Sequence, residues 1–211
     1  MVDIAVIDYG MGNLRSVHNA LSKVAPNATV EVTSDPVVVA QAGRVVFPGQ
    51  GSMPDCMREL DARHLRKAVM DAAKNKPFLG ICIGLQMLFE HSSEGDVACL
   101  GILSGEVVRF SHDLHDVHGN RLKVPHMGWN QVHHGDHAMW QGIAQDERFY
   151  FVHSYYVEPQ DRALVQAETQ YPAPFVCAVA RANLFAVQFH PEKSDAAGLQ
   201  LLKNFVTWNP V

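Results

Sequence analysis

The sequence predicts an α/β protein with a mixed, mostly parallel sheet that is flanked by helices and carries an antiparallel extension. Over roughly the first ninety residues, short apolar runs alternate with segments of helical periodicity. That order is typical of parallel strands whose two faces are covered by helices. In the second half, strand-like runs follow one another directly, which is typical of antiparallel strands. No linker rich in Gly, Pro or Ser interrupts the chain, so residues 1–211 are expected to form one domain.

The first half of the sequence predicts four strands and two helices. The expected strands cover residues 3–8, 28–33, 43–49 and 77–82, and the expected helices cover residues 12–24 and residues 54 to about 74. After the fourth strand, Leu85 and Phe89 recur at helical spacing. Ligands of parallel sheets bind outside the carboxyl ends of the strands, where Asp8, residues 48–51 and Cys82 fall.

The second half supplies six short strands and a closing helix. The expected strands cover residues 105–110, 127–134, 148–157, 163–169, 175–181 and 184–190, and the helix covers residues 196–208. Residues 111–121 are polar and rich in histidine, which predicts a surface loop.

Composition restricts the class of protein. A chain of 211 residues with 47% apolar and 18% charged residues can bury a sizeable core. The net charge of −5 gives no reason to expect a nucleic-acid partner, and no apolar run reaches the roughly 18 residues of a membrane span. The chain starts without the pattern of a signal peptide, and its four cysteines are scattered. We therefore expect free thiols and a cytoplasmic location.

The segment GICIGLQ, residues 80–86, places Cys82 between a predicted strand and a predicted helix. A nucleophile at such a turn is exposed at the edge of the sheet, and the free amides of the following helix favour a thiolate. The backbone amide of Ile83 would then receive the oxyanion formed when the sulfur attacks a carbonyl carbon. The motif alone leaves open a buried structural cysteine whose flanking glycines serve close packing.

A thiolate nucleophile needs a base, and the segment QFHPEKS, residues 188–194, offers one at another strand end. Pro191 ends the ladder after His190, and Glu192 falls on the same side as the imidazole in extended geometry. Its carboxylate could orient one ring nitrogen and leave the other for Cys82. A solvated strand end is the alternative for this motif taken alone.

The segment FPGQGS, residues 47–52, predicts a glycine-rich turn at a third strand end. Glycines on both sides allow the backbone amide of Gln50 to turn towards a ligand as a second oxyanion donor. An ordinary turn is the alternative, because most glycine-rich turns have no such role.

With these three segments together, the chain resembles the class I, or triad, glutamine amidotransferases. Three further segments, IDYGMGNLRSV (residues 7–17), PHMGWN (125–130) and YFVHSYY (150–156), resemble the glutaminase subunits of imidazole glycerol phosphate synthases of histidine biosynthesis. One departure is Gln50, where that family often has valine. Because the expected donor is a main-chain amide, we expect the change to be tolerated.

The resemblance implies an enzyme that hydrolyses L-glutamine to glutamate and ammonia through a cysteine thioester. Cys82 would be the nucleophile, His190 the base and acid, and Glu192 the residue that holds the imidazole. The positions that match the glutamine-binding residues of the family are Gly49, Gly51, Gln86, Glu94, Ser154 and Tyr155. Neither a cofactor nor a metal is implied.

The resemblance also implies a partner, a (β/α)8 barrel cyclase that forms a heterodimer with the glutaminase. Ammonia would pass into the cyclase, which makes imidazole glycerol phosphate and AICAR. The positions similar to family segments at that contact are Gly10, Asn13, Pro125 and Trp129. Without the resemblance, a tryptophan on a short strand would be expected in the core.

Two other functions stay open from the sequence. One is a triad glutaminase of another pathway, serving pyridoxal phosphate, anthranilate or GMP synthesis, in which IDYGMGNL and PHMGWN would not be expected. The other is a non-catalytic module that regulates a partner, against which an intact Cys82, His190 and Glu192 argues.

Two weaker patterns are set aside. The glycines of residues 8–17 imitate a dinucleotide fingerprint but lack the third glycine in register. Two histidine groups could suggest a metal, but neither has the context of a known metal motif, and they are expected to be solvated. They are His112, His115 and His118, and His133, His134 and His137.

Overall fold

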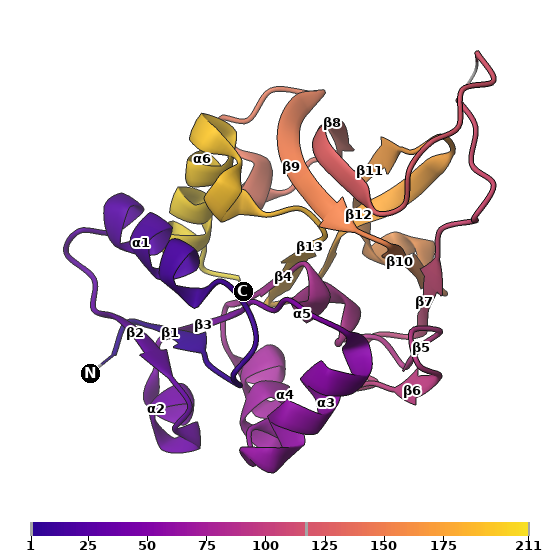
Figure 1. Cartoon of the computed structure of the whole chain (residues 1–211). Helices are drawn as coiled ribbons and strands as arrows, with labels where there is room; N and C mark the ends of the chain where they lie inside the picture. The colour runs from indigo at the N-terminus through magenta and orange to yellow at the C-terminus, as the bar shows by residue number, and fades with distance from the viewer. Residues whose placement is uncertain (1, 117, 211) are drawn as a thin grey trace.

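Thirteen strands form one mixed sheet in the computed structural model, which describes residues 2–116 and 118–210. The order is β2-β1-β3-β4-β13-β12-β10-β7-β5-β6; β11 pairs with β12 and β8, and β8 pairs with β9 (Figure 1). The predicted fold class is confirmed, since the first strands are parallel and the later ones mainly antiparallel.

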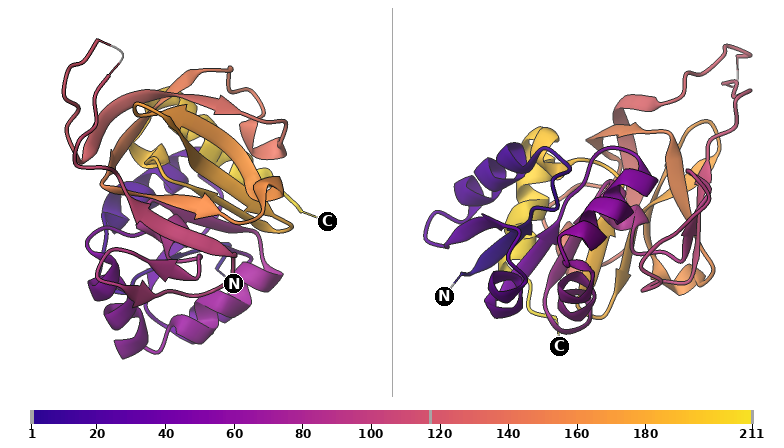
Figure 2. Two further views of the ribbon diagram at one scale, coloured as in Figure 1. Left: turned by 90° about the vertical axis from the view of Figure 1, so that its right-hand side faces the viewer. Right: turned by 60° about the horizontal axis from the view of Figure 1, so that its bottom comes forward.

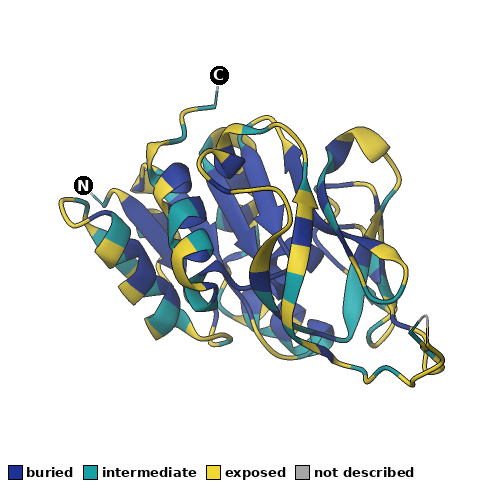
Figure 3. Cartoon of the chain, turned by 90° about the horizontal axis from the view of Figure 1, so that it is seen from above, coloured by how far each residue is buried: buried dark blue, intermediate teal, exposed yellow. Residues whose placement is uncertain are grey.

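In the parallel half of the sheet, the central strands are buried on both faces. Its strands are β1 (Ile4–Ile7), β2 (Val30–Thr33), β3 (Arg44–Phe47), β4 (Phe78–Ile81) and β13 (Leu184–Val187). Every residue of β1, β4 and β13 is buried, which explains why these segments read as continuous apolar runs (Figure 3).

Helices cover the two faces of this half. The longer helices are α1 (Leu14–Val24), α3 (Met53–Ala62), α4 (Arg66–Asn75) and α6 (Asp195–Thr207), and the shorter α2 covers Pro36–Gln41. Within β3, Val45 and Phe47 belong to the core beneath α2, α3 and α4, whereas Val46 belongs to the core beneath α1 and α6. The two sets of helices therefore lie on opposite sides of the sheet (Figures 1 and 2). No helix among the described residues is both long and apolar enough to cross a membrane.

The antiparallel half continues the sheet beyond β13. Its strands are β5 (His91–Ser92), β6 (Val97–Ala98), β7 (Gly105–Arg109), β8 (His126–His134), β9 (Glu147–His153), β10 (Tyr155–Pro159), β11 (Val165–Gln170) and β12 (Pro174–Arg181). Residues 111–121, apart from residue 117, project from this half as the predicted loop, with one bridge between His115 and Arg121 (Figure 2).

Two long predicted elements are each divided into two in the structure. The single helix from residue 54 to about 74 is two helices, because His64 adopts a φ of 57°. A right-handed helix cannot continue through a left-handed residue. The strand predicted over residues 148–157 breaks at Ser154, so that β9 pairs with β8 while β10 pairs with β7.

Three short elements were not predicted. Helix α2 begins with Asp35 as its N-cap and Pro36 in its first turn, a signal that the sequence does carry. Strands β5 and β6 have two residues each, too few to show a period. The helix predicted after Cys82 from the spacing of Leu85 and Phe89 is wrong in extent, since α5 covers only Ile83–Gln86.

Candidate active site

Cys82 lies at the sharp turn between β4 and α5. Its φ of 55° and ψ of −113° are strained for an L-residue, and its amide donates to the carbonyl of Val187 on the neighbouring strand, 2.8 Å away. The glycines around it permit close backbone packing. A Cβ on Gly84 would overlap the carbonyl oxygen of Phe47, and one on Gly80 would lie 3.0 Å from the Cβ of Ala186. The strained turn is therefore held by the strands on both sides of β4.

His190 and Glu192 form a buried pair after the end of β13. The Nδ1 atom of His190 lies 2.9 Å from Oε1 of Glu192, and the two side chains are 5% and 2% exposed. The amide of His190 donates to the carbonyl of Tyr150, and its carbonyl accepts from Oγ of Ser194 at 2.6 Å. Nε2 is buried without a hydrogen-bond partner among the described residues. The Nδ1 atom of the imidazole is thus held by Glu192, and the Nε2 atom is free to react.

The electrostatic surroundings of His190 favour an imidazolium. Burial lowers its pKa, but the neighbouring Cys82 sulfur and the Glu192 carboxylate raise it, and the net result is a pKa well above its usual range. A positive imidazole beside a thiol stabilises the thiolate. The pair is therefore arranged as a nucleophile and its proton carrier.

A pocket of about 230 Å³ opens on the thiol. The predicted residues that line it are Gln50, Gly51, Cys82, Ile83, Gln86, Glu94, Pro125, Ser154, Tyr155 and His190, together with Val152 and His153. A larger cavity of about 360 Å³ lies between β8 and β11, but no cysteine lines it. The smaller pocket is the candidate site because it alone of these two contains the thiol and the imidazole.

Two predicted residues lie just outside this pocket. Glu192 contacts the Nδ1 atom of His190 and does not line the pocket. Gly49 is enclosed between Tyr9 and Ile83, so that any Cβ there would overlap both side chains. Its role is to let the loop pass close to the start of α5.

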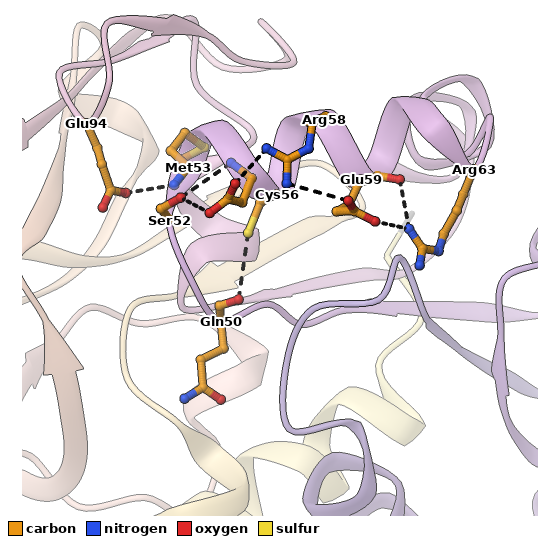
Figure 4. Close-up of polar contacts among 9 residues, drawn as sticks. Gln50, Ser52, Met53, Cys56, Arg58, Glu59, Arg63 and Glu94 are labelled. Carbon is orange, nitrogen blue, oxygen red and sulfur yellow. Dashed lines mark hydrogen bonds and ion pairs between the residues drawn. The ribbon is translucent and has the colours of Figure 1, made fainter.

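Gln86 and Glu94 already make contacts inside the protein. Nε2 of Gln86 donates to the carbonyl of Tyr155 at 3.0 Å and to Oε1 of Gln188 at 2.9 Å. Oε2 of Glu94 accepts from the amide of Met53 at 2.8 Å, at the beginning of α3 (Figure 4). Both residues therefore connect the pocket wall to its supporting elements.

The loop that carries Gln50 is attached to α3. The carbonyl of Gln50 accepts from the thiol of Cys56 at 3.8 Å, and Ser52 caps the helix by accepting from the amide of Asp55 (Figure 4). Gly51 adopts a φ of 121°, which glycine tolerates and most residues do not. The turn after β3 is thus attached to α3 and contains a glycine in the left-handed region.

Gln188 and His153 are site residues that the sequence interpretation missed. Gln188 is fully buried, and its Nε2 lies 3.7 Å from the sulfur of Cys82. The signal for it was present, because residue 188 precedes His190 by two positions on a predicted strand. His153 had no comparable signal, since its place in the pocket wall depends on the break at Ser154.

The residues predicted to contact a partner lie at the surface. Gly10, Asn13 and Pro125 are exposed, and Trp129 is 47% exposed. The expectation of a core tryptophan, made without the resemblance, is therefore wrong. On β8, Met127 is 62% exposed on the same side as Trp129, so two large apolar side chains face solvent together.

Neither a disulfide nor a metal cluster occurs among residues 2–116 and 118–210. All four cysteines are free and buried. Burial raises the pKa of Cys56 to about 12 and of Cys99 to about 11, and it also raises the pKa of Cys177. These three thiols are therefore poor nucleophiles, in contrast to a thiol placed beside His190.

Comparison with known proteins gives one consistent family. The family model described as glutamine amidotransferase class-I matches residues 5–208. The imidazole glycerol phosphate synthase subunit HisH of Thiobacillus denitrificans is 67% identical over 211 residues, which are 99% of this chain and 92% of that protein. The subunit of the same name from Dechloromonas aromatica is also 67% identical, over 98% of this chain and 97% of that protein.

Solved structures agree on the fold. A glutamine amidotransferase from Thermotoga maritima superposes with a TM-score of 0.60 at 17% identity, covering 90% of this chain and 76% of that chain. At this identity, the likeness concerns the fold alone. The strained cysteine turn, the buried histidine and carboxylate, and the match over nearly the whole length lead to one conclusion: the chain belongs to the class-I glutamine amidotransferase family.

Proposed function

We propose that this chain is the glutaminase subunit of an imidazole glycerol phosphate synthase, and that it hydrolyses L-glutamine to glutamate and ammonia. The observation that carries the proposal is the strained Cys82 in one pocket with His190, whose other nitrogen is held by Glu192. The high identity to subunits of that synthase selects this pathway over pyridoxal phosphate, anthranilate or GMP synthesis.

The first half of the reaction forms a thioester. The Cys82 sulfur attacks the side-chain amide carbon of glutamine, and His190 delivers a proton to the leaving nitrogen as the carbon–nitrogen bond breaks. The amides of Ile83 and Gln50 receive the negative charge on the oxygen of the tetrahedral intermediate. Ammonia leaves, and the glutamyl group stays on sulfur.

The second half releases glutamate. His190 takes a proton from water, whose oxygen attacks the thioester carbon, and the sulfur leaves as thiolate. Glu192 keeps the imidazole in one orientation through both steps and stabilises its positive form.

The rest of the pocket holds the amino-acid end of glutamine. Gly49, Gly51, Gln86, Glu94, Ser154 and Tyr155 are the proposed binding residues. Because Nε2 of Gln86 is engaged by two acceptors, its Oε1 is the atom left for the ammonium group of the substrate. The Glu94 carboxylate has one oxygen on Met53 and can offer the other to the same group.

The ammonia is used by a partner protein. Water would protonate free ammonia and remove its nucleophilicity, so we propose direct transfer to a (β/α)8 barrel cyclase that makes imidazole glycerol phosphate and AICAR. Gly10, Asn13, Pro125 and Trp129 are the proposed contacts, and Pro125 both lines the pocket and is exposed. The cytoplasm remains the expected location of this pair.

Reconstitution with a barrel cyclase tests the proposal. Cys82→Ala should abolish glutamine-dependent synthesis of imidazole glycerol phosphate while leaving ammonium-dependent synthesis intact, because only the first requires the thiol. Retention of glutamine-dependent synthesis would refute the assignment, and loss of both activities would show that the variant fails to fold or dock. Glutaminase activity of the wild-type chain alone should be low and should rise when the cyclase binds its nucleotide.

A further inference from the structure

Gln188 occupies an unusual position for a buried amide. It follows β13, is fully buried, and its backbone amide donates to the carbonyl of Cys177 at 2.8 Å. Its side chain lies between two residues of the pocket, with Nε2 3.7 Å from the Cys82 sulfur and Oε1 2.9 Å from Nε2 of Gln86. A buried amide normally donates to an oxygen, whereas this one points its N–H groups at the nucleophile.

The contacts of Gln86 fix which end of Gln188 faces the sulfur. The carbonyl oxygen of Tyr155 can only accept, so the atom of Gln86 that contacts it must be the nitrogen. That same nitrogen donates to Gln188, which must therefore present its oxygen to Gln86. The NH2 group of Gln188 is left to face Cys82.

The Tyr155 carbonyl is itself held by a second donor. Nδ1 of His153 lies 2.7 Å from it, and Nε2 of His153 lies 3.0 Å from Nδ1 of His126. Asn130 completes the chain, with its Nδ2 3.2 Å from Nε2 of His126 and 2.9 Å from the carbonyl of Gln170.

Only one set of proton positions satisfies this chain. Burial lowers the pKa of His126 to about 4 and that of His153 to about 3, so both rings are neutral near pH 7. His153 must donate from Nδ1 to the Tyr155 carbonyl, so its Nε2 accepts from His126. His126 then accepts from Asn130. Every donor therefore points the same way from Asn130 to the carbonyl.

We propose that Gln188 is a further catalytic residue, whose side-chain N–H donates to the Cys82 thiolate and stabilises it for attack. His190 supplies the positive charge and carries the proton, whereas Gln188 supplies a neutral donor that does not change its protonation during the cycle. Gln86, Tyr155, His153, His126 and Asn130 act as positioning residues that prevent the amide from turning over. The inference rests on the proposed role of Cys82 as the nucleophile.

The pH dependence of alkylation of the full chain by iodoacetamide tests this without glutamine or a partner. The other three thiols are buried with raised pKa values, so the reaction reports on Cys82, and Cys82→Ala protein supplies the blank. In Gln188→Met, which keeps the volume but loses the donor, the midpoint should rise by about one pH unit. Gln188→Glu keeps the contact with Gln86 but places a carboxylate oxygen at the sulfur. In this variant the midpoint of alkylation should rise further.

Two controls make the result decisive. Gln131→Glu adds the same charge at an exposed position of β8 and should leave the midpoint unchanged. The second control uses the wild-type chain and so does not depend on the folding of a variant. Its Gln188 side-chain amide proton resonance should shift with pH at the same midpoint as alkylation. The assignment would be overturned if the alkylation midpoint were unchanged in folded Gln188 variants. It would also be overturned if the side-chain amide resonance of Gln188 did not shift as the Cys82 thiol titrates. Because no turnover is measured, either result is separate from the success or failure of the glutaminase assay.

Discussion

At the scale of single residues, the candidate site depends on a backbone conformation that its own residue disfavours. Cys82 has a positive φ, and no glycine relieves it at that position. The strain persists because β3, β4 and β13 are buried and leave the turn no room to relax. The benefit is a sulfur that lines the pocket together with the His190 imidazole and contacts the side-chain amide of Gln188.

The Glu192→Gln variant tests how the imidazole is held. Glutamine can still contact Nδ1 of His190 but carries no charge, so the imidazolium loses its stabilisation, and the side-chain N–H can hold the wrong tautomer. We expect the rate constant of glutamine hydrolysis by the reconstituted pair to fall by about 10² to 10⁴-fold. Ammonium-dependent synthesis should be unchanged. A variant with near wild-type hydrolysis would show that Glu192 has no such role.

At the scale of elements, strand β8 and the break between α3 and α4 are the features with consequences for the site and for stability. On strand β8, the side chains of His126 and Asn130 belong to the hydrogen-bond chain that ends at Tyr155. Those of Met127 and Trp129 lie at the surface. This alternation is the period of two of a half-buried strand. One strand therefore carries both the proposed partner surface and the support of the pocket.

The break between α3 and α4 gives a prediction of stability. His64 is exposed and holds a φ of 57°, which costs an L-residue about 1 kcal/mol that glycine would not lose. We expect His64→Gly to raise the free energy of unfolding by about that amount, measured by urea denaturation. The same substitution inside α1, His18→Gly, should lower it by about 1 kcal/mol. Destabilisation by both changes would mean that residue 64 is not held in the left-handed conformation.

At the scale of the whole molecule, parallel pairing of β4 with β13 assembles the site. Ile81 pairs with Val187, so the ends of two strands more than a hundred residues apart lie side by side. Cys82 and Gln188 are the next residues along each strand, and their side chains are in contact. The candidate site is thus a consequence of the order of strands in the sheet rather than of any local segment.

The exposed face of β8 predicts where the partner binds. Trp129 and Met127 are large apolar side chains that are 47% and 62% exposed. Trp129→Ala should weaken binding to the barrel cyclase by about 10 to 100-fold, because buried tryptophans often dominate such interfaces. Titration calorimetry would measure it, with Val37→Ala, an exposed apolar position on α2, as the matched control. Equal losses in both variants would contradict the proposed surface.

The buried histidines predict how stability depends on pH. The folded pKa values of His126 and His153, about 4 and about 3, lie below the usual value near 6.5 of the unfolded chain. On acidification the unfolded state binds protons that the native state does not, so the free energy of unfolding should fall between about pH 6.5 and pH 4. The raised pKa of His190 acts in a different window, since its contribution is complete below pH 6.5 and is lost at alkaline pH.

Urea denaturation of wild-type chain and His126→Gln at pH 7 and pH 5 would measure this. The loss of stability on acidification should be smaller in the variant, by up to about 1 kcal/mol per pH unit. His118→Gln, in the exposed loop, should behave as wild type. A variant that loses as much stability as the wild type would place the acid sensitivity elsewhere.

The fold class, the succession of the main strands along the chain and the segments that carry the candidate site residues follow from the amino-acid sequence alone. Apolar periodicity is a local property of the sequence. The turns at the site are also indicated by residues within a few positions, namely the glycines around Cys82 and Pro191 after His190. The break at His64 could not be predicted, since histidine adopts a left-handed backbone more often than most residues but still rarely.

The contacts between side chains across the sheet follow only from the packed three-dimensional arrangement. Gln188, His153 and His126 reach the thiol or its supports through pairings between strands distant in the chain. The exposure of Trp129 likewise depends on which neighbours cover β8. Burial and hydrogen-bond direction are properties of the packed neighbours, and a linear pattern contains the residues but not their distances.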